Sequence, residues 1–255
     1  MQTAIQLYTL RFLEEPLSRT LERVANTTLD GVEFAGFGDE TPSALATQLD
    51  DLDLGVAGAH VSLSDLEESY EETAAAYDAL GCEHIVVPSY PREEFETAEG
   101  VDEAARRLST VAGRLETDGF SCHYHNHHFE FDTIDGETAF DRFAARADES
   151  VQFQIDTGLT RCADVDPVAL IDRYGDRISL VHLTDTDPDS SDSLHAELGD
   201  GIVDLEACVD AARRNDVEWL IGEHGGATEP LSTLERFDDE LHRLRGGDHG
   251  DGRSA

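Results

Sequence analysis

Four of the chain's eleven histidines fall within six positions, 123 to 128, in the segment HYHNHHFEF. Glu130 follows them and stands between two phenylalanines. Imidazole and carboxylate side chains together can bind a metal ion or transfer protons, so this segment is a candidate wall of an active site. A solvated loop or an adventitious metal-binding tract would have the same composition, so the choice depends on the rest of the chain.

Three further polar residues stand at or near the ends of short apolar segments: Asp156 in VQFQID, His182 in ISLVHLT and Glu223 in EWLIGE. Packing does not explain them, because a buried carboxylate without a partner is costly and neighbouring carboxylates repel each other. A divalent cation would remove both costs. With Glu130 as the fourth ligand, three carboxylates and one imidazole form a mostly oxygen-donor set, which favours Mn²⁺ or Mg²⁺ over a structural zinc site.

The elements that must position these residues follow from hydrophobic periodicity. Short apolar segments alternate with longer acidic segments of helical period, and we expect strands at 4–8, 31–35, 55–63, 84–89, 120–126, 151–156, 178–184 and 218–223. Eight strands, each followed by a helix, predict a single-domain α/β fold, the parallel (β/α)8 TIM barrel, over residues 1–245. An open doubly wound sheet is the alternative, but AGFGDE is a poor match to the GxGxxG turn that it needs.

Two helix starts are marked in the sequence. Ser64 and Glu67 have the spacing of a capping box, and Asp166 followed by Pro167 has the pattern of an N-cap with proline at the first helical position.

Strand parity predicts which side chains face the interior of the barrel. Alternate residues of each strand point inward, and the carboxyl ends of the strands form the mouth of the active site. The inward set near the mouth comprises His123, His125, His127, Asp156, His182 and Glu223. Glu130 lies just past the fifth strand, so one of the three histidines is an alternative to it as the metal ligand.

Sequence motifs occur at nearly every predicted strand end. IQLYTLR, GVEFAGF, GAHVSL, YHNHHFEF, QIDTG, VHLTD, LGDGIVD and GEH follow one another in this order over about residues 2 to 244. Together they resemble the xylose-isomerase-like sugar phosphate isomerase/epimerase family. Membership would imply a TIM barrel with one catalytic divalent metal, held by Glu130, Asp156, His182 and Glu223.

The resemblance also implies a reaction. Epimerases of this family act on a carbon next to a ketone, with the metal holding the carbonyl and an adjacent hydroxyl of a sugar or polyol. Glu130 and Glu223 would then be the catalytic acids and bases on opposite faces of an enediolate. We expect Mn²⁺, with Mg²⁺, Co²⁺ or Zn²⁺ as alternatives. A lyase or dehydratase acting on a keto-sugar, keto-inositol or 3-keto-glycoside would use the same groups.

Two other functions are less consistent with the sequence. An endonuclease of the same barrel superfamily would need a trinuclear zinc site and a basic groove for DNA, which the acidic composition disfavours. A carbohydrate-binding barrel without activity would not need the complete ligand set. The chain also departs from the family pattern, because Thr184 precedes Asp185 where many relatives carry lysine.

Five residues are candidates for substrate binding: Glu33, His60, His125, His127 and Arg11. The first four have inward parity. A polar barrel interior would explain Glu33 and His60 equally well, whereas His125 and His127 are expected to contact substrate or the carboxylates behind it. Arg11 is an attractive anion contact near the mouth, although a surface arginine would look the same. LGDGIVD (198–204) is interpreted as a substrate-covering loop that leads into a helix, although its glycines would also fit a simple turn. His84 and His195 are interpreted as structural or solvated.

Composition limits the partners and the compartment. The net charge is 18 − 56 = −38, lysine is absent, and the acids are spread along the chain. This pattern indicates a solvated acidic coat suited to concentrated salt, and it disfavours binding to nucleic acid or an anionic membrane. Four separated cysteines and the lack of an apolar leader predict a cytoplasmic protein. Residues 246–255 are expected to be a disordered tail, and a homo-oligomer is left open.

Overall fold

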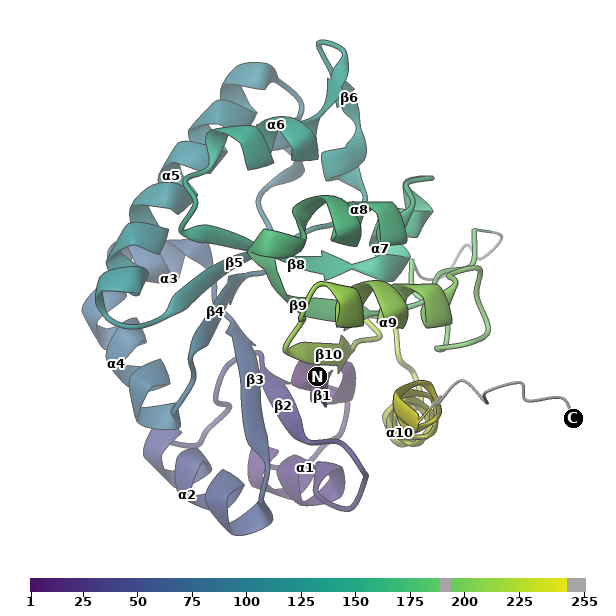
Figure 1. Cartoon of the computed structure of the whole chain (residues 1–255). Coiled ribbons are helices and arrows are strands. Elements are labelled where there is room, and N and C mark those ends of the chain that lie inside the picture. The colour runs from purple at the N-terminus through teal and green to yellow at the C-terminus, as the bar shows by residue number, and fades with distance from the viewer. Residues whose placement is uncertain (189–193, 247–255) are drawn as a thin grey trace, which may run out of the picture.

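Eight parallel strands close into a barrel in the computed structural model, which describes residues 1–188 and 194–246 (Figure 1). Around the barrel the strand order is β1-β10-β9-β8-β5-β4-β3-β2. The strands are β1 (Gln2–Gln6), β2 (Gly31–Phe34), β3 (Gly55–His60), β4 (His84–Val87), β5 (Ser121–His125), β8 (Val151–Asp156), β9 (Ile178–Leu183) and β10 (Trp219–Gly222). The predicted TIM barrel is therefore confirmed. Most of the predicted tail, from residue 247 on, falls outside the described residues.

Helices surround the strands and cover their outer faces (Figure 1). The α-helices are α1 (Leu17–Val24), α2 (Pro42–Leu52), α3 (Leu63–Glu68), α4 (Tyr70–Leu80), α5 (Ala98–Thr117), α6 (Ala139–Arg146), α7 (Thr157–Cys162), α8 (Pro167–Tyr174), α9 (Leu205–Arg214) and α10 (Pro230–Gly246). Short 3-10 helices are η1 (Leu7–Leu10), η2 (Arg92–Phe95), η3 (Phe129–Phe131) and η4 (Gly175–Arg177). A small antiparallel hairpin, β6 (Thr133–Ile134) with β7 (Glu137–Thr138), lies between β5 and α6.

The two predicted helix starts have different outcomes. The Asp166 carboxylate accepts the backbone N–H of Val168 at 2.9 Å and Pro167 begins α8, as predicted. In α3 the cap is Ser62, whose hydroxyl oxygen accepts the N–H of Asp65 at 3.1 Å. The helix thus starts two residues earlier than the Ser64–Glu67 pattern indicates, because Ser62 already satisfies the first turn.

The barrel interior is layered. Toward the amino ends of the strands it holds a small apolar cluster, made by Ala4, Ala57, Val86, Leu180, Trp219 and Ile221. The Trp219 ring lies where Gly31 and Gly55 have no Cβ, so the two glycines leave room for it. Polar side chains occupy the interior beyond this cluster, including Gln6, Glu33 and Gln154. The larger apolar core lies between the strands and the helices, so the inward and outward faces follow the predicted parity.

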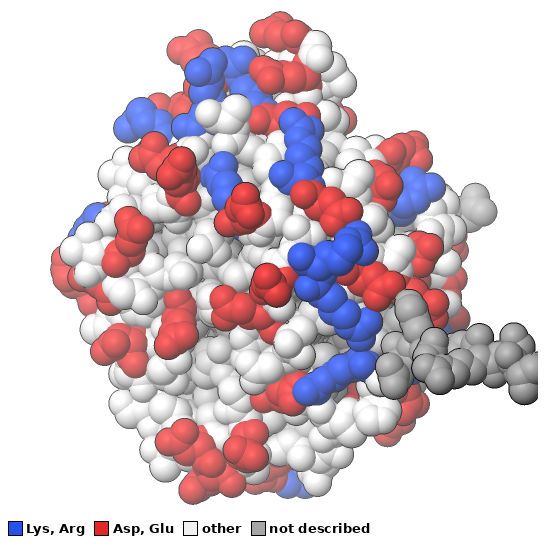
Figure 2. All heavy atoms as spheres, in the orientation of Figure 1, with Lys and Arg blue, Asp and Glu red and all other residues white. Residues whose placement is uncertain are grey.

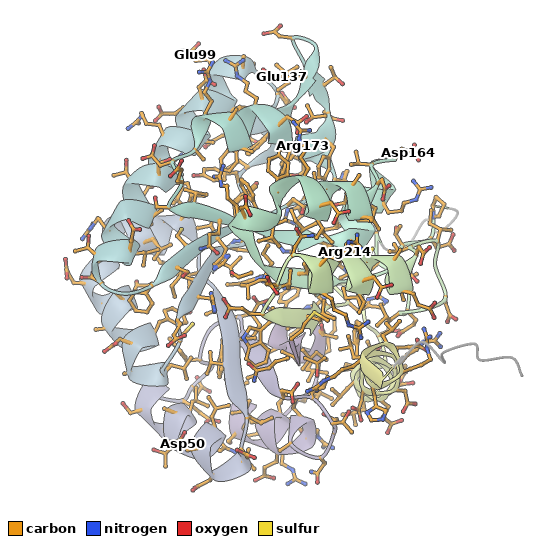
Figure 3. All side chains as sticks on the ribbon, in the orientation of Figure 1. Asp50, Glu99, Glu137, Asp164, Arg173 and Arg214 are labelled. Carbon is orange, nitrogen blue, oxygen red and sulfur yellow. The ribbon has the colours of Figure 1, made fainter. Side chains whose placement is uncertain are left out.

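The surface is strongly acidic. Figure 2 shows acidic side chains scattered over the whole visible face, with arginines interspersed among them. The labelled Asp50, Glu99, Glu137 and Asp164 lie at the edge of the fold, whereas Arg173 and Arg214 extend from α8 and α9 (Figure 3). Within the described residues, no helix is both long enough and apolar enough to cross a bilayer.

Candidate metal centre

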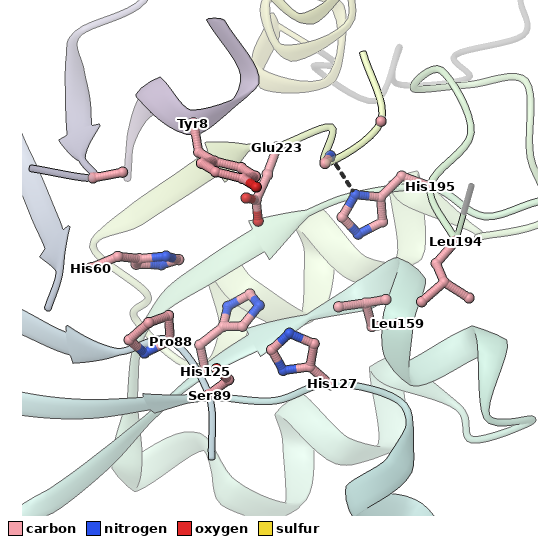
Figure 4. A pocket seen from close by; sticks show the side chains of 13 residues that line it. Tyr8, His60, Pro88, Ser89, His125, His127, Leu159, Leu194, His195 and Glu223 are labelled. Carbon is pink, nitrogen blue, oxygen red and sulfur yellow. Dashed lines mark hydrogen bonds between the residues drawn. The ribbon is translucent and has the colours of Figure 1, made fainter. Parts of the chain in front are cut away.

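A cavity of about 710 Å³ opens at the carboxyl ends of the strands. His60 ends β3, His125 ends β5 and Glu223 directly follows β10, so three strands deliver polar side chains to it. Figure 4 shows Glu223 and Tyr8 on one side of the cavity and His125 with His127 on the other. This end of a TIM barrel is where active sites are built, because the loops that follow the strands converge there.

Four buried side chains can direct one ligand atom each toward a common point: His125, Asp156, His182 and Glu223. These atoms all lie within 4.8 Å of one another, and a second group formed by His60, His125 and His182 overlaps the first. This set has two imidazoles and two carboxylates, whereas the sequence predicted mostly oxygen donors. The observed set is therefore better suited than the predicted one to a divalent transition metal such as Mn²⁺ or Zn²⁺.

Asp156 supplies the clearest sign that the group is built for a cation. Its Oδ1 accepts the N–H of Leu159 at 2.7 Å and the hydroxyl of Thr184 at 2.5 Å. Its Oδ2 is buried and accepts no hydrogen bond among the described residues, and Nε2 of His195 faces it from 3.6 Å. Burial would raise the pKa of Asp156, but the nearby His195 and other imidazoles lower it. An ionised oxygen that is buried and lacks a hydrogen bond is costly unless a cation faces it.

His182 lies between two carboxylates. Its Nδ1 is 3.0 Å from Oε2 of Glu223, and its Nε2 is 2.7 Å from Oε2 of Glu33. Burial alone would lower the pKa of His182, but the charge of Glu33 and the hydrogen bonds with both carboxylates raise it to about 10. A cation between His182 and Glu223 would take the place of one proton, while Glu33 would hold the other nitrogen, as carboxylates do behind metal-binding histidines.

Gln154 fixes the orientation of His125. The Gln154 amide donates from Nε2 to Oε1 of Glu33 at 2.5 Å, so its Oε1 faces the histidines. That oxygen lies 3.0 Å from Nδ1 of His125 and 2.9 Å from Nε2 of His60. Burial lowers the pKa of His125 well below its usual value. The neutral ring therefore carries its proton on Nδ1 and leaves the lone pair of Nε2 available to a metal.

Glu130, predicted as a ligand and as a catalytic acid, lies outside the ligand groups found among the described residues. Its Oε1 accepts the Tyr124 hydroxyl at 2.7 Å, and its Oε2 accepts the N–H of His127 at 2.9 Å. Tyr124 belongs to the core between strands and helices, and η3 folds Glu130 back onto it. The alternative left open by the sequence, a histidine of the fifth strand, matches the geometry through His125.

The other predicted substrate contacts divide into two sets. His60, His125 and His127 line the cavity, whereas Glu33 lies beneath it and is fully buried. Arg11 lies behind the wall rather than in it. Its guanidinium donates to the backbone carbonyls of Tyr8 and Gly225 and stacks 3.9 Å from the centroid of the Tyr8 ring.

Comparisons with known proteins agree with this fold. The model of the xylose isomerase-like TIM barrel family matches residues 21–245. The chain belongs to this family. An inosose dehydratase from Lacticaseibacillus casei is 24% identical over 251 residues, covering 82% of each chain.

Solved structures show the same fold. A sugar phosphate isomerase/epimerase from Parabacteroides distasonis superposes with a TM-score of 0.81 at 19% identity, covering 94% of this chain and 93% of that one. The IOLI protein with a bound zinc atom superposes with a TM-score of 0.78 at 13% identity, covering 96% and 98%.

The sequence placed two other histidines outside the site, and the structure agrees with this for one of them and not for the other. His84 is buried, with its Nδ1 3.0 Å from Nε2 of His123, in agreement with a structural role. His195 was interpreted as structural or solvated, yet it is only 9% exposed and lines the cavity of this xylose isomerase-like barrel. The sequence did contain a signal for the position of His195. The motif LGDGIVD binds Asp185 through its backbone N–H groups, and this contact folds the loop inward.

Proposed function

We propose that the chain is a divalent-metal-dependent isomerase or epimerase that removes a proton next to the carbonyl of a keto-sugar or keto-polyol. The observation that carries the proposal is the convergence of His125, Asp156, His182 and Glu223, with the buried Oδ2 of Asp156 lacking a hydrogen bond. When bound, Mn²⁺ or a similar ion would polarise the carbonyl and stabilise the negative charge that develops on deprotonation.

The chain's own residues would bind the substrate and move the proton. Glu223 is the carboxylate on the cavity wall, and only its Oε2 is engaged by His182. Burial would raise the pKa of Glu223, but the hydrogen bond and charge of His182 lower it, so the side chain is ionised and can accept a proton. His127 and His60 line other parts of the cavity and can donate hydrogen bonds to substrate hydroxyls or return a proton from another side.

A dehydratase is the second candidate, and the position of Glu130 favours it. Glu130 lies outside the ligand groups found among the described residues, which leaves Glu223 as the base in this proposal. Elimination of water needs one base together with assistance to the departing hydroxyl. The inosose dehydratase of L. casei supports this alternative as a relative. We infer that a proton is removed by the same base in either reaction.

Deuterium exchange separates the two reactions. Protein stripped with EDTA and reloaded with Mn²⁺ is incubated in D₂O with D-tagatose, D-fructose or inosose, and the products are examined by mass spectrometry. An epimerase gives an isomer that carries deuterium at the carbon next to the carbonyl, whereas a dehydratase gives a product lighter by one water.

Two variants control this experiment. Glu223→Gln should lose both exchange and bound metal, while Glu71→Gln, whose side chain is 90% exposed, should retain both. Failure to bind Mn²⁺, Mg²⁺, Co²⁺ or Zn²⁺ would contradict the proposal and support a carbohydrate-binding barrel. Three bound zinc ions would support the endonuclease class.

A further inference from the structure

The loop between β9 and α9 delivers one more histidine to the cavity. His195 lies in this loop and is almost fully buried. Its Nε2 lies 3.6 Å from Oδ2 of Asp156, one of the proposed metal ligands. Figure 4 shows the His195 ring on the cavity wall, across from His60 and beside Leu194.

Asp185 holds the described residues of this loop in place. Its carboxylate accepts backbone N–H groups from Thr186 at 2.9 Å, Gly199 at 3.1 Å, Gly201 at 2.9 Å and Val203 at 3.0 Å. A Cβ at Gly201 would overlap the Asp185 carboxylate, so the close approach requires glycine there. The backbone of the loop is also paired to the strand end, through the N–H of Ala196 and the carbonyl of Asp185 at 2.9 Å.

A second contact fixes which nitrogen of His195 carries the proton. The backbone N–H of Gly225, in the loop after β10, donates to Nδ1 of His195 at 2.9 Å. A backbone N–H can only donate, so Nδ1 must be the accepting nitrogen and the neutral ring carries its hydrogen on Nε2. The ring therefore presents an N–H donor toward Asp156 and the cavity, and it cannot turn over without breaking the contact with Gly225.

We propose that His195 is a substrate-contacting residue whose Nε2–H donates to an oxygen of the keto-polyol held beside Asp156. This inference rests on the proposed function and adds a specificity contact to the same site. The chemistry that it selects is an oxygen with a lone pair, either a hydroxyl or the carbonyl. A residue that only holds the loops together would use its contacts with Gly225 and Asp156 and would not need to reach the substrate.

Two variants separate these roles, because each keeps a different half of the ring. His195→Asn places an amide oxygen near the position of Nδ1, so it keeps an acceptor for the Gly225 N–H and removes the inner donor. His195→Gln reaches the position of Nε2 with an amide N–H and gives up the Gly225 contact. Both are loaded with Mn²⁺ and compared with wild type for metal content, melting temperature, and the kcat and KM of exchange with inosose and D-tagatose.

We expect His195→Asn to retain metal and melting temperature, while its kcat/KM falls by about 10- to 100-fold, mostly through KM. The rise in melting temperature that inosose or D-tagatose gives to the metal-loaded protein should shrink in parallel. His195→Gln should recover part of the lost kcat/KM despite a lower melting temperature.

Wild-type kcat/KM in His195→Asn would overturn the inference and leave the proposed function standing. Equal loss of metal from both variants would also overturn it, in favour of a metal-ligating or structural role. A wild-type protein that catalyses no exchange would overturn the proposed function, and this contact with it.

Discussion

Hydrogen bonds beneath the cavity determine what each histidine offers to a ligand. Glu33 contacts Gln6, Gln154, His60 and His182 and is itself completely buried. Burial would raise the pKa of Glu33, but the two imidazoles lower it well below its usual range, so its charge persists in the interior. Because Glu33 holds Gln154 and His182 at once, the lone pairs of the neighbouring imidazoles are oriented before any ligand binds.

The buried carboxyl group of Glu130 should make the free energy of unfolding depend on pH. Burial raises the pKa of Glu130 from 4.5 to about 7, despite its hydrogen bond from Tyr124. Between these values the folded chain holds a proton that the unfolded chain releases, so the free energy of unfolding falls as pH rises from about 4.5 to about 7. The loss amounts to about 3 kcal/mol at most.

Glu130→Gln mimics the protonated acid, so its free energy of unfolding should not fall in this way as pH rises. Its free energy of unfolding relative to wild type, from urea titrations, should rise by up to about 3 kcal/mol between about pH 5 and about pH 8. Glu71→Gln at the surface serves as the control. A difference between wild type and Glu130→Gln that does not change with pH would show that Glu130 is ionised throughout.

The sequence predicts the inward residues well and the position of Glu130 poorly. Parity alone places His125, Asp156, His182 and Glu223 on inward faces, because a strand alternates strictly. Glu130 lies beyond the strand end, where a 3-10 turn decides its direction, and its partner Tyr124 belongs to the outward face of β5. No periodicity extends into such a turn.

At the scale of elements, glycine permits the close strand contacts at the end of the barrel opposite the cavity, where the strands begin. Gly31 begins β2 and Gly55 begins β3, and the two are paired across the sheet. A Cβ on Gly31 would overlap the carbonyl of Gly55 and lie 3.0 Å from the Trp219 ring. Backbone atoms cannot move aside as a flexible side chain can, so added volume there must distort the barrel.

Gly31→Ala should therefore lower the free energy of unfolding by about 1–3 kcal/mol. Gly113→Ala is the matched control, because it lies in α5 with nothing within 4 Å of the new Cβ. Alanine is the better helix former, so this variant should gain about 0.5–1 kcal/mol. Denaturant titrations measure both free energies of unfolding. A Gly31→Ala variant as stable as wild type would contradict the packing described where β2 and β3 begin.

Element order is the part of the fold that the sequence predicts most fully. All eight barrel strands lie within the predicted segments or differ from them by a few residues, since apolar runs between acidic helices are unambiguous. The β6–β7 hairpin was not predicted, and the segment around His195 was predicted as a loop but without its course into the cavity. The inward course of that loop depends on contacts between residues far apart in the sequence, such as those of Asp185 with the N–H groups of Gly201 and Val203. The hairpin instead turns locally at Asp135 and Gly136, which both have positive φ.

For the molecule as a whole, charge is the dominant feature. The net charge is −38, and arginines on the surface pair with acids across helices, as Arg107 does with Glu67 and Glu94. Exposed pairs of this kind contribute little, so they do not offset the repulsion among the remaining carboxylates. Screening by salt should therefore stabilise the fold.

Raising KCl from about 0.1 M to about 2 M should increase the melting temperature, because the screening length shortens to a few ångströms. A neutral osmolyte such as sorbitol, at equal osmolality in about 0.1 M KCl, is the control for solvent exclusion. An increase no larger with KCl than with sorbitol would show that charge repulsion does not limit the stability of this chain.

Metal content most directly tests the proposed centre, because it distinguishes His125 from Glu130 as the fourth ligand. Wild type, His125→Gln and Glu130→Gln are stripped with EDTA, reloaded with Mn²⁺, desalted and assayed for bound metal. We predict about one Mn²⁺ per chain in wild type and in Glu130→Gln, and little in His125→Gln, because only His125 points a lone pair at Asp156, His182 and Glu223. Retention of metal by His125→Gln together with its loss from Glu130→Gln would contradict the centre described.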